Sequence, residues 1–215
     1  MTYLQLVNSV LRRLREDEVT TVDESDYAKL IGDFVNDSKR QVEDAWDWTA
    51  LRNTYTITTA SGTPTYALTD FGVRSNVLYV HNETTNGYIN QESLQRIRQL
   101  SLGTDNAVGT PYYFAIENVD SNGDANIRFY QTPNAVNIIS VYTIKRTDNL
   151  TVDTDTILIP TAPVVQYAFS FALRERGETG GQSAVEQAAF AKQDLNNAIA
   201  HDASLNPEGT LWTTV

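Results

Sequence analysis

The sequence predicts an α+β protein in which helices from the two ends of the chain form one bundle, with an antiparallel β module inserted between them. Apolar residues recur at three- and four-residue spacing over the first fifty residues and again after Pro163, whereas the region between alternates apolar and polar residues. An amphipathic helix cannot bury its apolar face alone, so we expect both helical ends to pack together. The predicted parts are an N-terminal helical hairpin at 1–52, the β module at 53–160, C-terminal helices at 161–203 and an extended tail at 204–215.

The N-terminal hairpin consists of two predicted helices. The first is expected near 3–16, where leucine and valine residues share one face, and the second near 24–47. The connector between them is short and polar, which predicts that the helices run antiparallel. The second helix closes at Trp46 and Trp48, and two indoles at the end of an apolar stripe are typical of core residues.

The β module is predicted from a change of period at Asn53. Val136 to Lys145 is expected to be a strand, and residues 111–118 and 126–133 are expected to form a hairpin. Asn86-Gly87 is a strong turn signal between two further strands. We expect Tyr66 to Leu68 to pair back on the first strand of the module.

The last third of the chain predicts two more helices, at 164–176 and 183–203, separated by a glycine-rich break. Their expected inward positions are Phe169, Leu173, Phe190 and Leu195. The tail that follows is polar apart from a few apolar residues, among them Leu205, Leu211 and Trp212.

The composition narrows the classes of function. The net charge of −11 disfavours nucleic-acid binding, because attraction to the phosphate backbone needs clustered Lys and Arg. The absence of cysteine excludes disulfides, thiolate metal sites and cysteine nucleophiles. No apolar run has the length needed to cross a bilayer, so we expect no membrane contact. The N-terminus is not typical of a signal peptide, which fits synthesis in the cytoplasm.

The sequence offers no catalytic constellation. His81 and His201 are far apart in the chain, and isolated surface histidines are the expected outcome. Residues 120–124 superficially resemble a calcium loop, but Ala125 replaces the sixth-position glycine and Gln131 replaces the acidic twelfth residue. We therefore predict a hairpin turn at this position, and neither enzymatic activity nor a metal or cofactor.

Arg12, Arg13 and Arg15 form the one compact basic cluster of the sequence. Contact with nucleic acid is one interpretation of this cluster. The simpler interpretation, which we favour, places the three arginines on the exposed face of the first helix. There they would pair with acidic residues of the second helix or of a neighbouring subunit.

The helical ends contain a recognisable set of motifs: the pattern Val-Asn-x-Val-Leu-x-x-Leu at 7–14, the Val-Thr-Thr-Val connector at 19–22, and the closing residues Trp46 to Thr49. In these motifs the chain resembles the head–tail connector adaptors of tailed bacteriophages. An aromatic-rich helix from Pro163 to Arg176, followed by a Glu/Ala/Gln helix at 183–203, is similar as well. The likeness is greatest to the tail tubular protein A type of short-tailed phages.

The resemblance implies a structural virion protein at the head–tail junction, joining the portal to the tail. Such adaptors form a homo-oligomeric ring, usually of twelve copies, whose helical part meets the portal and whose β module faces a tail nozzle or another tail protein. Genomic DNA passes through the lumen without specific binding. The acidic composition fits this role, because it repels DNA phosphates.

Two sets of residues are expected to make the contacts of this ring. Neighbouring subunits would pair Arg12, Arg13 and Arg15 with Asp33, Asp37, Glu43 and Asp44. Because each surface pair contributes only ~0–1 kcal/mol, these pairs would set the register while apolar contacts hold the ring. Leu205, Leu211 and Trp212 are expected to anchor the tail in a portal groove, since disordered tails are usually poor in apolar residues.

The alternative interpretation is a carbohydrate- or receptor-binding module of a phage tail. Its aromatic residues would be Tyr66, Tyr79, Tyr88, Tyr112, Tyr113 and Tyr130. These tyrosines alternate as strand residues do, and packing between strands is the more common use of such a pattern. A third interpretation, a small hydrolase, would need acidic groups that converge in a cleft.

Overall fold

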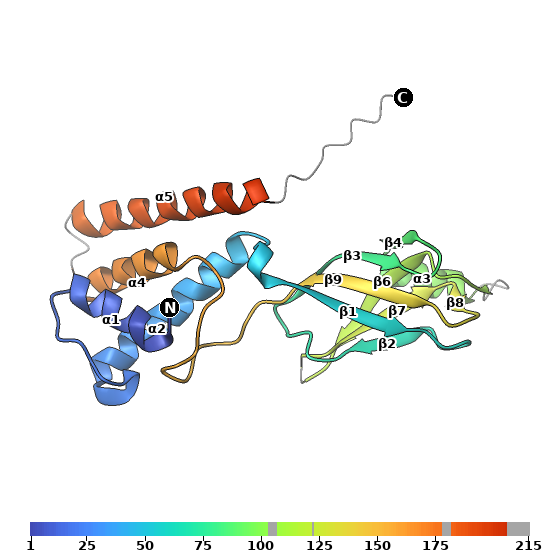
Figure 1. Cartoon of the computed structure of the whole chain (residues 1–215), viewed down its shortest axis with the longest axis horizontal. Helices are drawn as coiled ribbons and strands as arrows, with labels where there is room; N and C mark the ends of the chain where they lie inside the picture. Colours follow the sequence, from blue (N-terminus) through green and yellow to red (C-terminus); the bar gives the residue numbers. More distant parts are fainter. Residues whose placement is uncertain (103–106, 122, 178–181, 206–215) are drawn as a thin grey trace, which may run out of the picture. The chain divides into compact units, whose positions relative to one another are not determined.

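The computed structural model describes residues 1–102, 107–121, 123–177 and 182–205 (Figure 1). The chain divides into two compact units. A helical unit comprises Met1–Leu51 and Asp148–Val215, and a β module comprises Arg52–Thr147. The mixed α+β class predicted from the sequence is confirmed.

The helical unit is built from four α-helices and two short 3-10 turns. The α-helices are α1 (Tyr3–Arg13), α2 (Asp26–Ala45), α4 (Thr161–Glu175) and α5 (Gln182–Leu205), and the turns are η1 (Val22–Glu24) and η2 (Thr49–Leu51). Helix α4 is apolar on almost all sides and contacts α1, α2 and α5. A helix of this composition is stable only when neighbours cover it.

Local signals fix the ends of the first two helices. Thr2 and Gln5 form a reciprocal capping box that starts α1, and the Ser25 hydroxyl accepts a hydrogen bond from the Ala28 amide at the start of α2. Helix α1 ends at Arg13, three residues earlier than predicted. The reason is that Arg15 adopts a left-handed conformation with φ of 59°, which interrupts the helix.

Two of the four expected inward positions of the C-terminal helices are buried. Leu173 and Leu195 are each 8% exposed, and Phe169 is half-buried. The expectation for Phe190 is wrong, because its side chain is 56% exposed. Phe190 directly precedes the buried Ala191. Adjacent residues of a helix point in different directions, so the Phe190 side chain lies outside the face of α5 that contacts α4.

A buried polar network joins α2 to the chain that returns from the β module. The Lys39 ammonium lies 3.0 Å from the Glu43 carboxylate and donates a hydrogen bond of 2.8 Å to the Asp148 carbonyl. The Asn36 side chain exchanges two hydrogen bonds with the backbone of Leu150. These contacts pair polar groups that would otherwise be costly to bury.

The β module contains a seven-stranded sheet with the order β1-β9-β3-β4-β6-β7-β2 and a separate two-stranded sheet of β5 and β8. The strands are β1 (Arg52–Thr58), β2 (Thr65–Leu68), β3 (Asn76–Asn82), β4 (Gly87–Gln91), β5 (Val108–Gly109), β6 (Tyr113–Val119), β7 (Ala125–Tyr130), β8 (Thr132–Pro133) and β9 (Ile138–Ile144). Helix α3 (Leu94–Leu102) follows β4 and packs on β6 and β7.

The antiparallel prediction holds for most but not all of the sheet. The β6–β7 hairpin and the β3–β4 hairpin both form, and Asn86 takes the left-handed conformation that its turn requires. Strands β4 and β6 pair in parallel instead. The chain between them, which includes α3, supplies the crossover that a parallel pair needs.

The expected pairing of Tyr66 to Leu68 with the first strand is wrong. This segment forms β2 and pairs with β7, in the register Tyr66 to Ile127. The Tyr66 ring packs 5.9 Å from that of Phe129, and Leu68 joins the module's core. Pairing with β7 therefore gives β2 aromatic packing in addition to backbone hydrogen bonds.

Candidate interaction surfaces

The structure brings no metal cluster together within the residues that it describes. His81 lies 3.2 Å from Glu83 at the end of β3, and His201 is exposed on α5. Residues 120 and 124 close the β6–β7 turn through reciprocal hydrogen bonds, so the predicted hairpin turn is confirmed. None of the described helices combines the length and the apolar character that a membrane span requires.

The three arginines of the basic cluster lie near the C-terminal end of α1, where their side chains are exposed. Arg12 pairs with Glu18 of the connector at 2.9 Å, and Arg13 donates to Gln166 of α4 at 2.8 Å. Burial lowers the pKa of the Arg13 guanidinium, and Arg12 acts in the same direction, while Asp194 opposes both. Neither of these two contacts involves an acidic residue of α2.

Arg176, which directly follows α4 and which the sequence did not single out, lies in the same region. Arg176 pairs with Glu16 and donates a hydrogen bond of 2.8 Å to the Tyr27 hydroxyl, with its guanidinium 5.0 Å from the centre of that ring. Arg174, two residues earlier in the last turn of α4, is exposed. Only the fold reveals this neighbourhood, because the two helix ends are far apart in the sequence.

Three of the four expected acidic residues lie on the exposed face of α2. Asp33, Asp37 and Asp44 are separated by four and seven residues, which places them on one stripe of the helix. The expectation for Glu43 is contradicted, because its side chain is 1% exposed and bound to Lys39. Two features of the sequence indicate that Glu43 is buried. It directly follows the buried Val42, and it lies four residues, about one helical turn, after Lys39.

The tail anchors are only partly described. Leu205, the last residue of α5, is 61% exposed. Leu211 and Trp212 lie outside the described residues. Asp202, one turn before the end of α5, accepts hydrogen bonds from the Trp46 indole, the Thr49 amide and the Thr49 hydroxyl at 2.9, 3.1 and 3.2 Å. These bonds attach the end of α5 to the segment that follows α2.

The six tyrosines of the alternative interpretation do not form one surface. Tyr130 is buried, and Tyr66 and Tyr113 are half-buried. Tyr112 is 40% exposed and contacts Tyr113 and Tyr130. Tyr79 and Tyr88 are 45% and 70% exposed.

Tyr79 and Tyr88 join a residue that the sequence analysis missed, Tyr142 of β9. We call Tyr79, Tyr88 and Tyr142 the tyrosine face. The rings of Tyr79 and Tyr142 are stacked at 4.4 Å with an interplanar angle of 21°, and Tyr88 meets Tyr79 edge-on at 6.0 Å. Tyr142 lies opposite Thr54 of β1 and Tyr79 of β3, so strand register alone aligns these residues.

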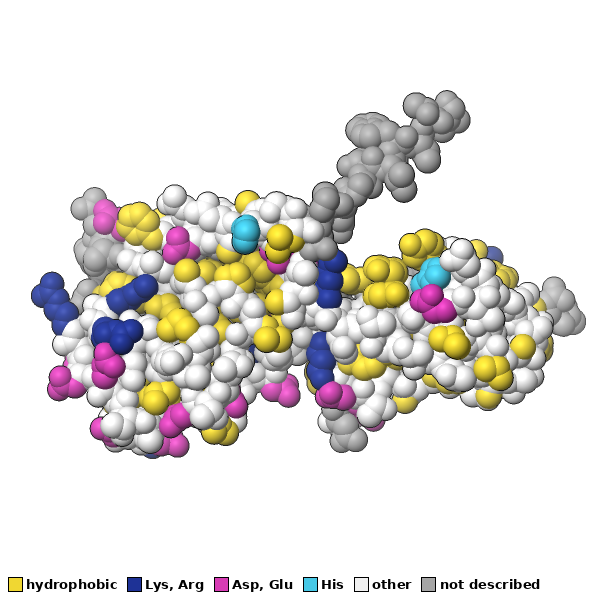
Figure 2. Space-filling view, in the orientation of Figure 1, with side chains coloured by type: hydrophobic (Ala, Val, Ile, Leu, Met, Phe, Trp, Pro, Cys, Tyr) yellow, Lys and Arg dark blue, Asp and Glu magenta, His cyan; other side chains and the backbone are white. Residues whose placement is uncertain are grey.

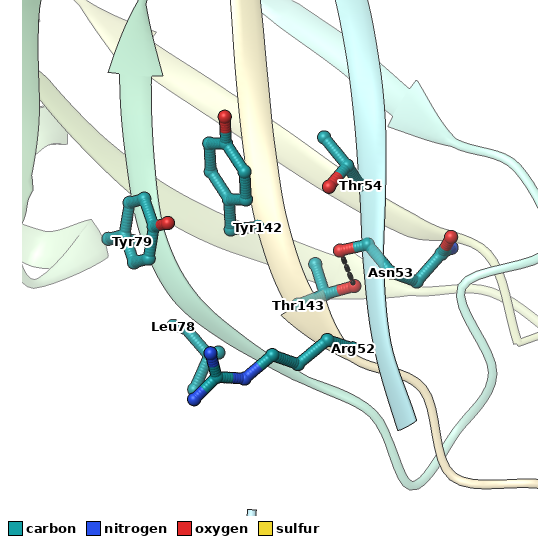
Figure 3. Close-up of a pocket in the computed structure, with 7 residues that line it drawn as sticks. All are labelled: Arg52, Asn53, Thr54, Leu78, Tyr79, Tyr142 and Thr143. Atoms are coloured by element: carbon teal, nitrogen blue, oxygen red, sulfur yellow. Dashed lines mark hydrogen bonds between the residues drawn. The ribbon is translucent and has the colours of Figure 1, made fainter. Parts of the chain in front are cut away.

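A groove of about 370 Å³ lies beside the stacked rings (Figure 3). Its lining comes from β1, β3 and β9 and consists of Arg52, Asn53, Thr54, Leu78, Tyr79, Tyr142 and Thr143. In Figure 3 the Tyr79 and Tyr142 rings lie beside each other and the Arg52 side chain extends from β1. Burial raises the pKa of the Tyr79 hydroxyl, with smaller effects from Tyr142 and Tyr88, while Arg52 opposes them, so the hydroxyl stays neutral at physiological pH.

The two units differ in charge. The β module contains seven basic and seven acidic residues and is therefore neutral, whereas the helical unit contains nine basic and twenty acidic residues. The whole net charge of −11 thus belongs to the helical unit. Figure 2 shows the same contrast on its visible face, where acidic side chains are numerous over the helices and few over the β module.

Comparison with known proteins gives one result that covers both units. Curated protein sequences gave no match. The sequence model of the SU10 adaptor protein family, in contrast, matches residues 1–210. The match supports a structural protein of the phage head–tail adaptor kind. It does not confirm the tail tubular protein A type. The chain belongs to the SU10 adaptor protein family.

Proposed function

We propose that this protein is a ring-forming adaptor of the phage virion. It joins the portal at the capsid vertex to the tail, with the helices from both ends of the chain acting as one bundle, and forms part of the DNA conduit during genome ejection. The observation that carries the proposal is the family match over residues 1–210, which includes the helical unit and the β module alike.

The distribution of charge supports the conduit role. The helical unit carries the full net charge of −11, and an acidic surface repels the phosphates of a passing duplex. A conduit protein must not retain the genome, so a surface without net attraction for DNA favours passage of the duplex. Binding of DNA to this chain at physiological salt would contradict this part of the proposal.

The ring is proposed to close through unlike faces of neighbouring subunits. One face carries Arg12, Arg13 and Arg15 at the end of α1, and the other carries Asp33, Asp37 and Asp44 on α2. Because Glu43 is buried, it is not part of the second face. The ring is proposed to have twelve copies and to contact a tail nozzle or another tail protein through the β module.

The test of the function is the mass of the purified protein in solution, measured by light scattering alone and then with the portal of the same phage. We expect a complex of the portal with about twelve adaptor subunits, the copy number proposed above, because heterologous contacts that close on themselves give a ring of defined size. A protein that remains unassociated in the presence of portal would exclude the adaptor function.

Reversing a charge at the proposed ring contact should weaken assembly. For Arg15→Glu we expect the adaptor concentration that half-saturates portal to rise several-fold, because each subunit contact loses about 0–1 kcal/mol and gains a like-charge repulsion. The effect should shrink at high salt. Lys192→Glu, which changes an exposed cation on α5, is the matched control and should assemble as the unmodified protein does. Equal losses in both variants would show a general charge effect instead.

Removing the tail should separate portal attachment from folding. A chain that lacks residues 204–215 is expected to lose portal attachment and to retain its circular dichroism spectrum and melting temperature. Folding should persist because Ala191, Leu195 and Asp202, which contact the rest of the helical unit, remain. A double substitution of Leu211 and Trp212 to serine tests the anchors alone. Portal attachment by the truncated chain would refute this role of the tail.

Binding of a carbohydrate or receptor is the second candidate function. The exposed Tyr79 and Tyr88 and the adjacent groove favour it. The stacking of Tyr79 on Tyr142 argues against it, because each ring turns one face toward the other rather than toward a sugar. Titration of the protein with candidate glycans, followed by tyrosine fluorescence, would decide between the two.

A further inference from the structure

We propose that Asp202 fixes the point at which the C-terminal tail leaves the helical unit, and that it is thereby a positioning residue for the contact of this tail with the portal. The part that concerns the portal rests on the proposed function. The part that concerns the origin of the tail rests on contacts within the helical unit alone.

Apolar packing holds the middle of α5 but not its end. Ala191 and Leu195 are 0% and 8% exposed, on the side of α5 that contacts α4. From Asn196 to Leu205 every side chain is half-buried or exposed, and Leu205 itself is 61% exposed. A helix end with few buried apolar contacts frays readily, so another contact is needed to hold the last turn of α5 in place.

The Asp202 carboxylate supplies that contact. Its Oδ2 atom accepts hydrogen bonds from the Trp46 indole, the Thr49 amide and the Thr49 hydroxyl. Hydrogen bonds to an ionised acceptor are stronger than those between neutral groups. Trp48, which lies between the two donor residues in the chain, is 1% exposed and donates to the Val42 carbonyl. The last turn of α5 is therefore bound to a segment that is itself held in place.

The position of Asp202 does not favour the helix that carries it. Asp202 lies three residues before the end of α5. A negative side chain in the last turn opposes the helix macrodipole, and aspartate is a weaker helix former than alanine. Replacement by alanine should therefore strengthen the helix locally while it releases the last turn from Trp46 and Thr49, so the two effects have opposite signs.

A fixed origin favours binding of the tail to a partner. Once the helical unit is bound to portal, binding of the tail is an intramolecular step, and its effective concentration depends on the positions that the tail can reach. A tail with a fixed origin also loses less conformational entropy when it binds. Release of Asp202 should therefore weaken portal attachment while the anchors Leu211 and Trp212 remain unchanged.

The first test measures hydrogen exchange of the backbone amides of residues 200–205 in the full chain without portal. Asp202→Ala is expected to lower their protection factors about tenfold or more, because three hydrogen bonds are lost. Asn197→Ala is the matched control, since it replaces an exposed side chain of the same helix with the same strong helix former and should not lower protection. Unchanged or increased protection in Asp202→Ala, with the circular dichroism spectrum of the unmodified protein, would overturn the inference.

The second test determines whether Asp202 acts on portal attachment through the tail. It combines Asp202→Ala with an insertion of about six Gly and Ser residues directly after Leu205, which frees the origin of the tail by itself. Light scattering gives the adaptor concentration that half-saturates purified portal for the unmodified chain, each single variant and the combination.

Alone, Asp202→Ala should raise this concentration about threefold or more, whereas in the chain with the insertion it should change it by less than about 1.5-fold. No effect of Asp202→Ala alone, or effects of the two changes that multiply in full, would overturn the positioning role. An unmodified protein that fails to bind portal refutes the proposed function instead, and the exchange measurement still decides whether Asp202 fixes the end of α5.

Discussion

Replacing Glu43 with alanine is expected to lower the free energy of unfolding of the helical unit by about 3–5 kcal/mol, because it removes the carboxylate that is paired with a buried ammonium. The Lys39 and Glu43 side chains are each 1% exposed, and their charged groups are 3.0 Å apart. In the variant, Lys39 keeps its hydrogen bond to the Asp148 carbonyl, which does not compensate a full charge. Loss of the carboxylate should therefore be much more costly than loss of an exposed one.

The measurement is urea unfolding followed by tryptophan fluorescence, which reports the helical unit because all three tryptophans belong to it. Asp44→Ala is the matched control, since it removes an adjacent exposed carboxylate from the same helix, and we expect it to change the free energy of unfolding by less than about 0.5 kcal/mol. Lys39→Met with Glu43→Leu removes both charges and should recover most of the loss. Equal effects of Glu43→Ala and Asp44→Ala would show that the buried pair is not important for stability.

Glu43 also shows where reasoning from sequence reached its limit. The helical period of α2 was correctly predicted, and it assigns Asp33 and Asp37 to the exposed face. The same period assigns Glu43 to the buried stripe, but a charged residue there is expected only when a buried partner is known. The partner Lys39 is four residues away, and the Asp148 carbonyl is more than one hundred residues away. Of these two contacts, only the one with the Asp148 carbonyl could not be predicted without knowing the fold.

The β module illustrates the same division between local and distant information. The β6–β7 and β3–β4 hairpins were predictable because a short turn sets each pairing. The partner of β2 and the parallel pairing of β4 with β6 were not, because they depend on packing across the sheet. Tyr142 was missed for this reason: its alternation was visible, but its stack with Tyr79 follows from the register of β3 against β9.

The second large effect is expected at Trp48. Replacing Trp48 with alanine should lower the free energy of unfolding of the helical unit by about 3–5 kcal/mol, the range for truncating a buried aromatic side chain. The indole is 1% exposed and donates a hydrogen bond of 2.8 Å to the Val42 carbonyl, near the end of α2. The substitution therefore leaves a cavity and removes a partner from a buried carbonyl at the same position.

Trp46→Ala is the matched control, because the sequence pairs these two tryptophans and the structure separates them. Trp46 is 37% exposed, and Asp202, which accepts its indole hydrogen bond, keeps both hydrogen bonds from Thr49 when that indole is removed. We expect its loss to cost about 1 kcal/mol, the contribution of one exposed hydrogen bond. Urea unfolding followed by circular dichroism at 222 nm suits both variants, because neither removes a helix. Trp48→Phe should recover more than half of the loss if the cavity dominates, and little of it if the hydrogen bond to Val42 dominates. A smaller effect for Trp48→Ala than for Trp46→Ala would mean that the indole of Trp48 is not a central part of the helical core.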